Sequence, residues 1–187
     1  MKKKMIAAAG GVLLCLSLGQ MALADKGGHD DDDDNATTFI AKMTSNQEAP
    51  IASSAAKGTF KLKVVDANTW TYELTYSGLE GTITQSHIHL AQPGVSGGIS
   101  IWLCGTAALP GPAGTPVCVG NGATLTGTIT AASVIGPTAQ GVNVAGDTAA
   151  SNFARALSAI RAGNAYANIH STRVGAGEIR GQIRDVD

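Results

Sequence analysis

The sequence predicts an all-β protein: an antiparallel, Greek-key-like β-sandwich or barrel with one short helix near residues 149–162. Three observations lead to this fold class. Two adjoining segments alternate apolar and polar residues with the two-residue period of a strand. Glycine, proline and asparagine turns separate many further short segments. A single stretch instead repeats its apolar residues at helical spacing.

The first 24 residues carry the three-part pattern of a secretory signal peptide. Three lysines precede an apolar run from Met5 to about Leu18, and residues 22–24 (Ala-Leu-Ala) supply a cleavage site. The run is shorter than the ~20 apolar residues that span a bilayer, and nothing later predicts membrane insertion. We therefore expect a secreted or periplasmic protein. A lipoprotein signal with Cys15 as the lipidated residue is the alternative, but a bulky leucine precedes that cysteine.

Residues 25–36 form an acidic segment without apolar periodicity, which predicts a disordered linker. Asp25 and the run Asp30–Asp34 account for most of the acidic excess that remains after signal cleavage. Weak Ca²⁺ capture by this run is the alternative, although the run lacks the ligand spacing and the glycine of an EF-hand loop.

Residues 37–187 are nearly neutral and have the length of one domain, for which we expect a single β-domain. A basic patch or stripe is the electrostatic signature of proteins that bind nucleic acid. A nearly neutral domain with few aromatic residues lacks this signature, so we exclude nucleic acid as a partner.

The clearest strands are expected at 57–64 and 69–76. In the first, Phe60, Leu62 and Val64 share one face, and the second alternates in the same way from Trp70 to Tyr76. A short Asp-Ala-Asn turn separates the two segments, which together predict a β-hairpin. Further strands are expected at 38–44, 83–91, 98–103, 123–130, 165–170 and 178–184.

A helix is predicted within residues 147–163. Phe153, Leu157 and Ile160 recur at helical spacing. Asp147 or Ser151 can cap its start and the glycine at 163 can end it. We expect this short amphipathic helix to cover one edge or end of the sheet.

Signal cleavage removes Cys15 and leaves two cysteines, Cys104 and Cys118. An even pair in an exported chain favours a disulfide over two free thiols. The bridge would close a loop rich in glycine and proline, which local propensity does not order. The chain-entropy model gives about 3 kcal/mol for a loop of about 15 residues.

Two segments around the histidines, 86–101 and 167–183, resemble each other. Each contains Ile-His near the end of a strand, a glycine five residues after the histidine, and then a second isoleucine-rich strand. The common unit is therefore strand, Gly-rich loop, strand. It places His89 and His170 at equivalent positions, where the first strand of each unit leads into the Gly-rich loop.

Three motifs together resemble the CHRD domain, a module named after chordin that is also widespread in exported microbial proteins. They are the HIH segment followed by PGVSGG (87–98), the terminal YANIHSTRVGAGEIRGQI (166–183) and the early SNQEAP (45–50). The resemblance covers roughly residues 37–184. The cysteine-bearing insert at 104–118 is not part of these motifs.

The resemblance implies an extracellular β-sandwich-like module without a firmly established enzyme activity. Within the last motif we expect Glu178, Arg180 and Gly181 to be structural residues. The partner is expected to be an extracellular protein or a glycan, since exposed strand edges and Gly/Pro loops suit either. No residue pattern selects between them.

The histidines are the candidate functional residues. Residues two apart on a strand point to the same side, so His87 and His89 share a face, and Tyr166, Asn168 and His170 share another. If the two related units lie side by side, three imidazoles could converge. A His-x-His pair with a third histidine suits copper or zinc, which makes His87, His89 and His170 candidate metal ligands.

The arrangement is similar to the copper, zinc superoxide dismutase sandwich by analogy alone. The further ligands of that enzyme cannot be placed in this sequence, so its activity is not carried over. General acid–base catalysis has no support either, because no GxSxG motif is present and no carboxylate pair is indicated by the spacing.

The alternative interpretation of the histidines is structural. A neutral imidazole can donate to a carbonyl and accept from an N–H, and Gly-rich loops expose many such groups. Alternating polar residues of the last strand (Glu178, Arg180, Gln182 and Arg184) could join the same network. The sequence thus favours a secreted, non-catalytic binding or structural module, with an extracytoplasmic copper- or zinc-binding protein as the alternative.

Overall fold

The structure is a computed structural model that describes residues 37–186. The predicted signal peptide (1–24) and acidic linker (25–36) lie outside this range and stay predictions. The described chain forms one antiparallel, nearly closed, barrel-like sheet with the strand order β5-β4-β7-β8-β1-β2-β3-β6, and β9 pairs with β1. The strands are β1 (Thr38–Thr44), β2 (Lys57–Asp66), β3 (Thr69–Ser77), β4 (Ile83–Leu90), β5 (Gly98–Cys104), β6 (Thr124–Thr130), β7 (Ala165–Ser171), β8 (Ile179–Gln182) and β9 (Arg184–Asp185).

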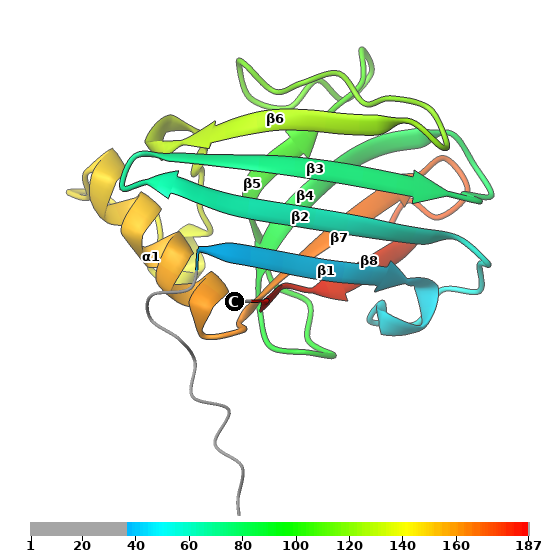
Figure 1. Cartoon of the computed structure of the whole chain (residues 1–187), viewed down its shortest axis with the longest axis horizontal. Coiled ribbons are helices and arrows are strands. Elements are labelled where there is room, and N and C mark those ends of the chain that lie inside the picture. The colour runs from blue at the N-terminus through cyan, green and yellow to red at the C-terminus, as the bar shows by residue number, and fades with distance from the viewer. Residues whose placement is uncertain (1–36, 187) are drawn as a thin grey trace, which may run out of the picture. The chain divides into compact units, whose positions relative to one another are not determined.

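The sheet folds over into two layers (Figure 1). Strands β1, β2, β3 and β6 lie nearer the viewer, and β4, β5, β7 and β8 lie behind them. Chain-successive strands are often not neighbours, as at β3–β4, β5–β6 and β6–β7, which is the Greek-key character that the sequence predicts. Large buried side chains fill the space between the layers, among them Trp70, Phe39, Phe60, Leu74, Ile88 and Ile101. The predicted fold class is confirmed.

The predicted hairpin is β2–β3, and its register pairs Phe60 with Leu74 and Leu62 with Tyr72. The other expected strands also form, with ends that differ by one or two residues. One expectation is wrong in detail. The strand predicted at 178–184 is two strands that are separated at Ile183: β8 lies between β7 and β1, whereas β9 pairs with β1 alone. The N–H of this fully buried residue still donates to the Ala165 carbonyl of β7, and β9 beyond it pairs with β1.

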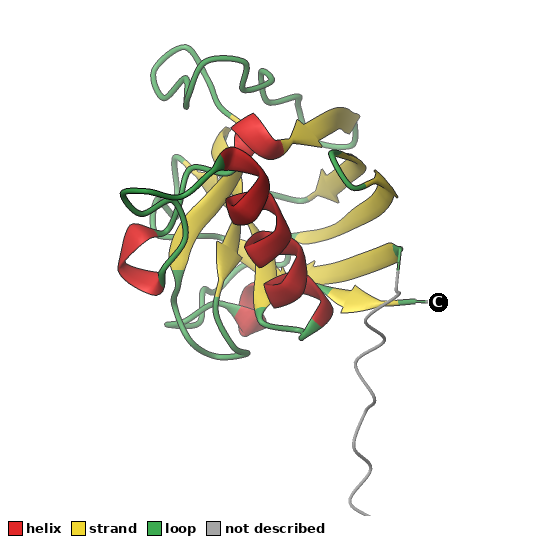
Figure 2. Ribbon diagram, turned by 90° about the vertical axis from the view of Figure 1, so that its left-hand side faces the viewer, coloured by secondary structure: helices red, strands yellow, loops and turns green. Residues whose placement is uncertain are grey.

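The predicted helix is α1 (Ala149–Arg161), and it lies across one end of the two layers (Figures 1 and 2). Its amphipathic face is anchored in the core, where the ring of Phe153 stacks on Trp70 with centroids 4.0 Å apart. Gly163 follows with a φ of 62°, a left-handed conformation that suits glycine just after a helix. Among the described residues, no helix is long and apolar enough to cross a membrane.

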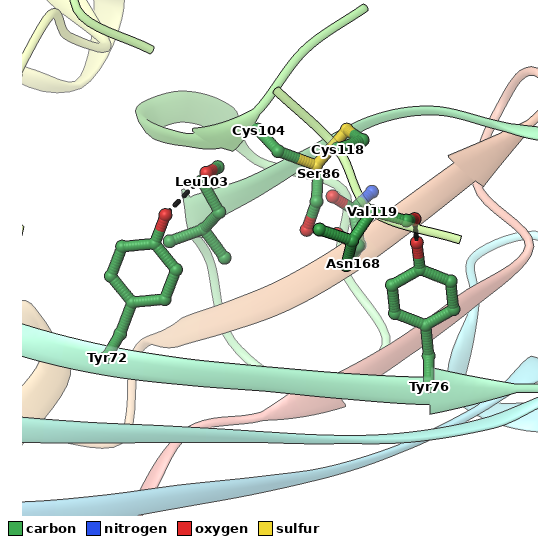
Figure 3. The surroundings of a disulfide bond; sticks show 8 residues. All are labelled: Tyr72, Tyr76, Ser86, Leu103, Cys104, Cys118, Val119 and Asn168. Atoms are coloured by element: carbon green, nitrogen blue, oxygen red, sulfur yellow. Dashed lines mark hydrogen bonds between the residues drawn. A yellow bond between two sulfur atoms is a disulfide. The ribbon is translucent and has the colours of Figure 1, made fainter. Parts of the chain in front are cut away.

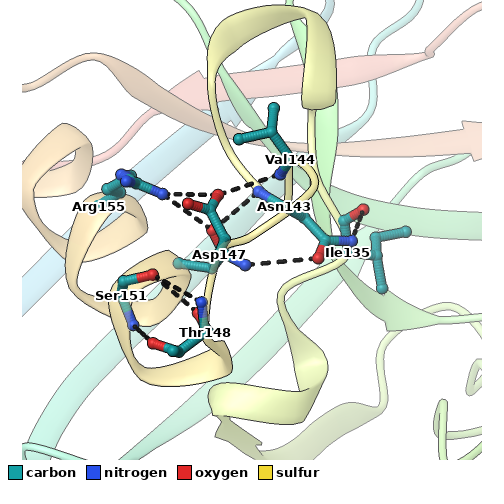
Figure 4. A network of polar contacts seen from close by, with 8 residues as sticks. Ile135, Asn143, Val144, Asp147, Thr148, Ser151 and Arg155 are labelled. Atoms are coloured by element: carbon teal, nitrogen blue, oxygen red, sulfur yellow. Dashed lines mark hydrogen bonds and ion pairs between the residues drawn. The ribbon is translucent and has the colours of Figure 1, made fainter.

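The cap of α1 is neither of the two candidates, Asp147 and Ser151. Thr148 is the N-cap, and its side chain and that of Ser151 each accept from the other residue's backbone N–H (Figure 4). Asp147 instead accepts from the N–H of Val144 and forms an ion pair with Arg155 at 2.6 Å. That ion pair lowers the pKa of Asp147, with the hydrogen bond from Arg155 as the largest cause.

Cys104 and Cys118 form the predicted disulfide, with an S–S distance of 2.03 Å. Two tyrosines of β3 reach across the core to the chain beside this bridge (Figure 3). The Tyr72 hydroxyl donates to the Leu103 carbonyl at 2.6 Å, and the Tyr76 hydroxyl donates to the carbonyl of Val119. The bridge therefore fixes the loop after β5 at a point where the two layers are also hydrogen-bonded.

A Cys104→Ser/Cys118→Ser double variant should lower the free energy of unfolding by about 3 kcal/mol. The physical reason is that the unfolded chain regains the freedom of a closed loop of this length. Urea denaturation measures the effect, and wild-type protein under reducing conditions is the matched control. A loss below about 1 kcal/mol in both samples would contradict the account.

Gly181 of β8 lies against the backbone of β1. A Cβ there would come within 2.4 Å of the Lys42 carbonyl oxygen and 2.7 Å of its carbon. Since backbone atoms cannot move aside as a side chain can, Gly181→Ala should cost about 2 kcal/mol of stability. Thermal denaturation measures this cost. Gly120→Ala, which meets no atom within 4 Å, is the control, and equal melting temperatures for the two variants would overturn the prediction.

Candidate metal centre

The three candidate histidines come from two neighbouring strands of the back layer, β4 and β7. Their antiparallel register pairs His87 with Asn168 and His89 with Tyr166. The next residue of β4, Ile88, belongs to the hydrophobic core, so the histidines lie on the opposite face of the sheet. The two related strand–loop–strand units therefore do lie side by side, as the convergence of the imidazoles requires.

The three rings form one compact, buried cluster. One nitrogen from each of His87, His89 and His170 lies within 4.8 Å of the other two. Three points this close lie within about 2.8 Å of a common centre, and metal–imidazole bonds are about 2.0–2.1 Å long. The rings are 0%, 7% and 8% exposed, which separates them from bulk water. Small shifts of the side chains would thus bring all three nitrogens to bonding distance from one ion.

Two of these histidines have a defined tautomer. Nδ1 of His89 lies 2.9 Å from the Gly97 carbonyl oxygen, and Nδ1 of His170 lies 2.9 Å from that of Gly175. A carbonyl oxygen only accepts, so each Nδ1 carries the proton and each Nε2 carries a lone pair, which is unpaired in His89 and accepts from Asn168 in His170. A backbone carbonyl on the far ring nitrogen is also how metal-binding histidines are commonly oriented.

The structural interpretation is therefore right in one respect, since His89 and His170 hold the two Gly-rich loops. The related units use different glycines for this contact. His170 bonds the glycine five residues on, Gly175, whereas His89 bonds Gly97, beyond the glycine that its counterpart predicts.

His87 does not fit the structural interpretation. It is fully buried, and neither of its ring nitrogens has a hydrogen-bond partner among the residues that the structure describes. Nε2 of His89 is buried and unpaired as well. Burying such a group without a partner costs free energy that an apolar side chain would not cost. One nitrogen of His87 lies within 4.8 Å of a nitrogen of each other imidazole, and His87 and Trp102 pack edge to face with ring centroids 4.3 Å apart.

Burial keeps the three imidazoles neutral. It lowers the pKa of His87 to about 2, with repulsion from the protonated forms of His170 and His89 as further causes. Burial likewise lowers the pKa of His89 to about 4, and it lowers the pKa of His170. At neutral pH the cluster therefore presents the uncharged form of imidazole, which is the form that binds metal ions.

Arg180, predicted as a structural residue, lies beside this cluster. Its guanidinium lies 4.2 Å from the centroid of the Tyr166 ring, and that ring stacks on His89 with centroids 4.8 Å apart. Its Nη1 donates to the Val95 carbonyl at 3.0 Å, in the loop that covers the cluster. Arg180 thus connects the loop after β4 to β8 and supports the ring of His89 through Tyr166.

Glu178 is also structural, but it is not a member of the histidine cluster. Its fully buried carboxylate accepts from the Ser54 hydroxyl at 2.7 Å, from the Glu80 N–H at 2.8 Å and from the Ser171 hydroxyl. Three separate segments meet at this one carboxylate. The sequence suggests that Glu178 could join the network of the histidines, whereas these hydrogen bonds form a separate network.

Glu48, from the SNQEAP segment, is a residue that sequence reasoning missed. Burial raises its pKa to about 7, and the nearby charge of Arg180 opposes this rise. A Cβ at Gly177 would come within 2.7 Å of a Glu48 carboxylate oxygen, and the φ of 129° at this position favours glycine. The early motif and the terminal motif of the sequence therefore meet in space, which accounts for their joint occurrence.

Asn168 is the other missed residue, and it contacts the cluster directly. Its Nδ2 lies 2.8 Å from Nε2 of His170, and it is 2% exposed. The two-residue period that places it on the face of His170 was the available signal. Trp102 carried no comparable signal, since its contact with His87 depends on the register of β5.

Comparisons with known proteins give the following similarities. The family model of the CHRD domain matches residues 39–183. No curated protein sequence matches the chain significantly. Among solved structures, Candida albicans superoxide dismutase 5, with Cu(II), is similar at a TM-score of 0.47 and 14% identity, over 81% of this chain and 94% of that one.

Proposed function

We propose, from the premise that the chain belongs to the CHRD domain family, that this domain is a non-catalytic, extracytoplasmic module that binds one copper or zinc ion. The ligands are His87, His89 and His170. The bound ion would link β4 to β7 on the face that the Gly-rich loops cover. Metal binding would therefore couple the order of these loops to the presence of the ion.

One observation carries this proposal: His87 is buried with both ring nitrogens unpaired, beside the unpaired Nε2 of His89 and the Nε2 of His170, which accepts a hydrogen bond from Asn168. A ligand that accepts electron pairs satisfies all three rings at once. Imidazole is a good ligand for copper and zinc. The cluster contains no carboxylate, whereas Ca²⁺ and Mg²⁺ favour oxygen ligands, so the donor set supports a transition metal.

Export is part of the proposal. The signal-peptide pattern of residues 1–24 and the Cys104–Cys118 disulfide both support an oxidising compartment. Copper and zinc would then be taken up outside the cytoplasm, by a protein that is secreted or periplasmic.

A binding or structural module without metal is the second candidate. The Nδ1 bonds of His89 and His170 to their loops favour it, because these contacts hold the loops without an ion. In this case the functional surface would face an extracellular protein or a glycan, as the sequence predicts.

Metal retention separates the two candidates. Purified protein is dialysed against sub-stoichiometric Cu²⁺ and Zn²⁺, and the bound metal is then quantified by mass spectrometry. The proposal predicts close to one equivalent in the wild type and loss of binding in His89→Ala and His170→Ala. If the wild type retains no metal while both substitutions lower the melting temperature, the purely structural module is the correct function.

A further inference from the structure

Asn168 lies among the three histidines and has no assigned role. It is on β7, directly opposite His87 on β4, and its side chain is almost fully buried. Its amide nitrogen contacts His170 at 2.8 Å, while its Oδ1 is buried and has no hydrogen-bond partner in the described part of the chain. A buried amide with one end paired and the other end unpaired is unusual in a folded protein.

The hydrogen bonds around His170 determine which end of the amide faces it. The Gly175 carbonyl requires the proton of His170 on Nδ1, so Nε2 of the ring can only accept. Asn168 must therefore present its NH₂ group to Nε2, and its oxygen must point elsewhere. The reverse orientation would set two lone pairs against each other.

The oxygen end belongs to the same cluster. Asn168 lies directly opposite His87 in the register of β4 and β7, on the sheet face that carries the three imidazoles. The Nε2 of His89 and the Oδ1 of Asn168 are thus two unpaired acceptors in one buried space, beside the unpaired ring of His87. A cation would satisfy all of them.

The amide also occupies the lone pair that a metal needs. His170 cannot bind an ion through Nε2 while the N–H of Asn168 points at that atom. Turning the amide over removes this N–H and brings Oδ1 close to the position that Nδ2 now holds, 2.8 Å from Nε2. Two ligand atoms on a tetrahedral ion with bonds of about 2.0–2.1 Å lie roughly 3.3 Å apart, so a small shift would make Oδ1 and Nε2 neighbours on one ion.

We propose that Asn168 is the fourth ligand of the site: its amide turns over when the ion enters, and Oδ1 completes a four-coordinate set with the three imidazoles. This inference rests on the proposed metal-binding function and deepens it. A site of three nitrogens and one oxygen suits Zn²⁺, which is usually four-coordinate and tetrahedral.

The test compares Zn²⁺ affinity, measured by competition with a chromophoric chelator, in the wild type and two variants. Asn168→Leu keeps the size but removes the oxygen, and it should weaken Zn²⁺ binding at least about tenfold. Asn168→Asp keeps an oxygen in the same place and adds a negative charge, so it should bind at least as tightly as the wild type. Asn152→Leu is the matched control: Asn152 is as buried as Asn168 but lies in α1, and its loss should leave the affinity unchanged.

A second measurement needs no variant. The side-chain amide of Asn168 is followed by ¹⁵N NMR as Zn²⁺ is added, and its hydrogen bond to His170 should disappear with one equivalent of metal. If the wild type binds Zn²⁺ and loses the hydrogen bond, but Asn168→Leu binds as tightly, Asn168 is not a ligand and the three-histidine site stands. If the hydrogen bond persists in the Zn²⁺-loaded protein, Nε2 of His170 is not a ligand, and both the fourth ligand and the three-histidine set are overturned. If the wild type binds no Zn²⁺, the metal-binding function fails and this inference fails with it.

Discussion

His87→Leu should stabilise the metal-free protein by about 1–2 kcal/mol and abolish its metal binding. The gain in the free energy of unfolding arises because two buried ring nitrogens without partners are replaced by an apolar side chain. Part of this gain is offset by the lost edge contact with Trp102. The metal affinity should fall by more than about 100-fold, because changing even an outer-shell partner of a ligand typically costs 10–100-fold.

His87→Leu is informative because its stability should rise while its metal affinity should fall. Urea denaturation gives the stability of the metal-free protein, and chelator competition with Zn²⁺ gives the affinity. Asn152→Leu is again the control. It removes a buried amide that does have a hydrogen-bond partner, the Asn143 N–H, and should lose stability while it keeps the metal. If His87→Leu is destabilised as much as this control, His87 has a structural role and the central argument is wrong.

As the pH is lowered, the metal-free protein should begin to lose stability at pH values well above the folded-state pKa values of its buried histidines. The pKa of His87 is about 2 and that of His89 about 4 in the folded state, against an ordinary value of 6.5. Stability is thus fully present above pH 6.5 and decreases as the pH falls toward the folded values, because the unfolded chain binds the protons first. Each of these two histidines should contribute a loss of about 1.4 kcal/mol per pH unit between pH 6 and pH 4.5.

Glu48 changes the pH dependence of stability in the opposite direction from the histidines. Its folded pKa of about 7 lies above the ordinary 4.5, so its contribution to stability is fully present below pH 4.5 and is lost as the pH rises through 7. It therefore offsets part of the acid loss from the histidines. Urea denaturation from pH 8 to pH 4 should show a steeper loss in Glu48→Gln than in the wild type, and a shallower loss in His87→Leu. Equal slopes in all three proteins would show that these groups are not buried as the structure places them.

Local pattern predicted most of the strands of this fold. The alternation of apolar and polar residues over 57–64 and 69–76 can be read from neighbouring residues alone. It predicts the hairpin β2–β3 correctly except for the C-terminal ends of the two strands. The break at Ile183 escaped prediction, because the end of the pairing with β7 depends on where distant strands lie. The helix cap was missed for a smaller reason. Several residues near the start of α1 can cap, and the backbone decides in favour of Thr148.

The candidate site was predictable only in part. The His-x-His spacing and the related segment around His170 predicted three imidazoles that converge, provided that the two segments are neighbours. The pairing of β4 with β7, more than 70 residues apart in sequence, supplies that condition. The role of Asn168 needed the tautomer of His170, and the position of Glu48 beside Arg180 needed a contact between the two ends of the domain. No local sequence pattern indicates the role of Asn168 or the position of Glu48.

The X-ray absorption spectrum of the Zn²⁺-loaded protein tests the central claim most directly, since it counts the imidazoles bound to the ion. The account predicts one zinc per chain with three imidazole nitrogens at about 2.0–2.1 Å. It also predicts that this signal disappears in His87→Leu under the same loading conditions. One or no imidazole on the metal, or an unchanged spectrum in His87→Leu, would show that the buried histidines do not form a metal centre.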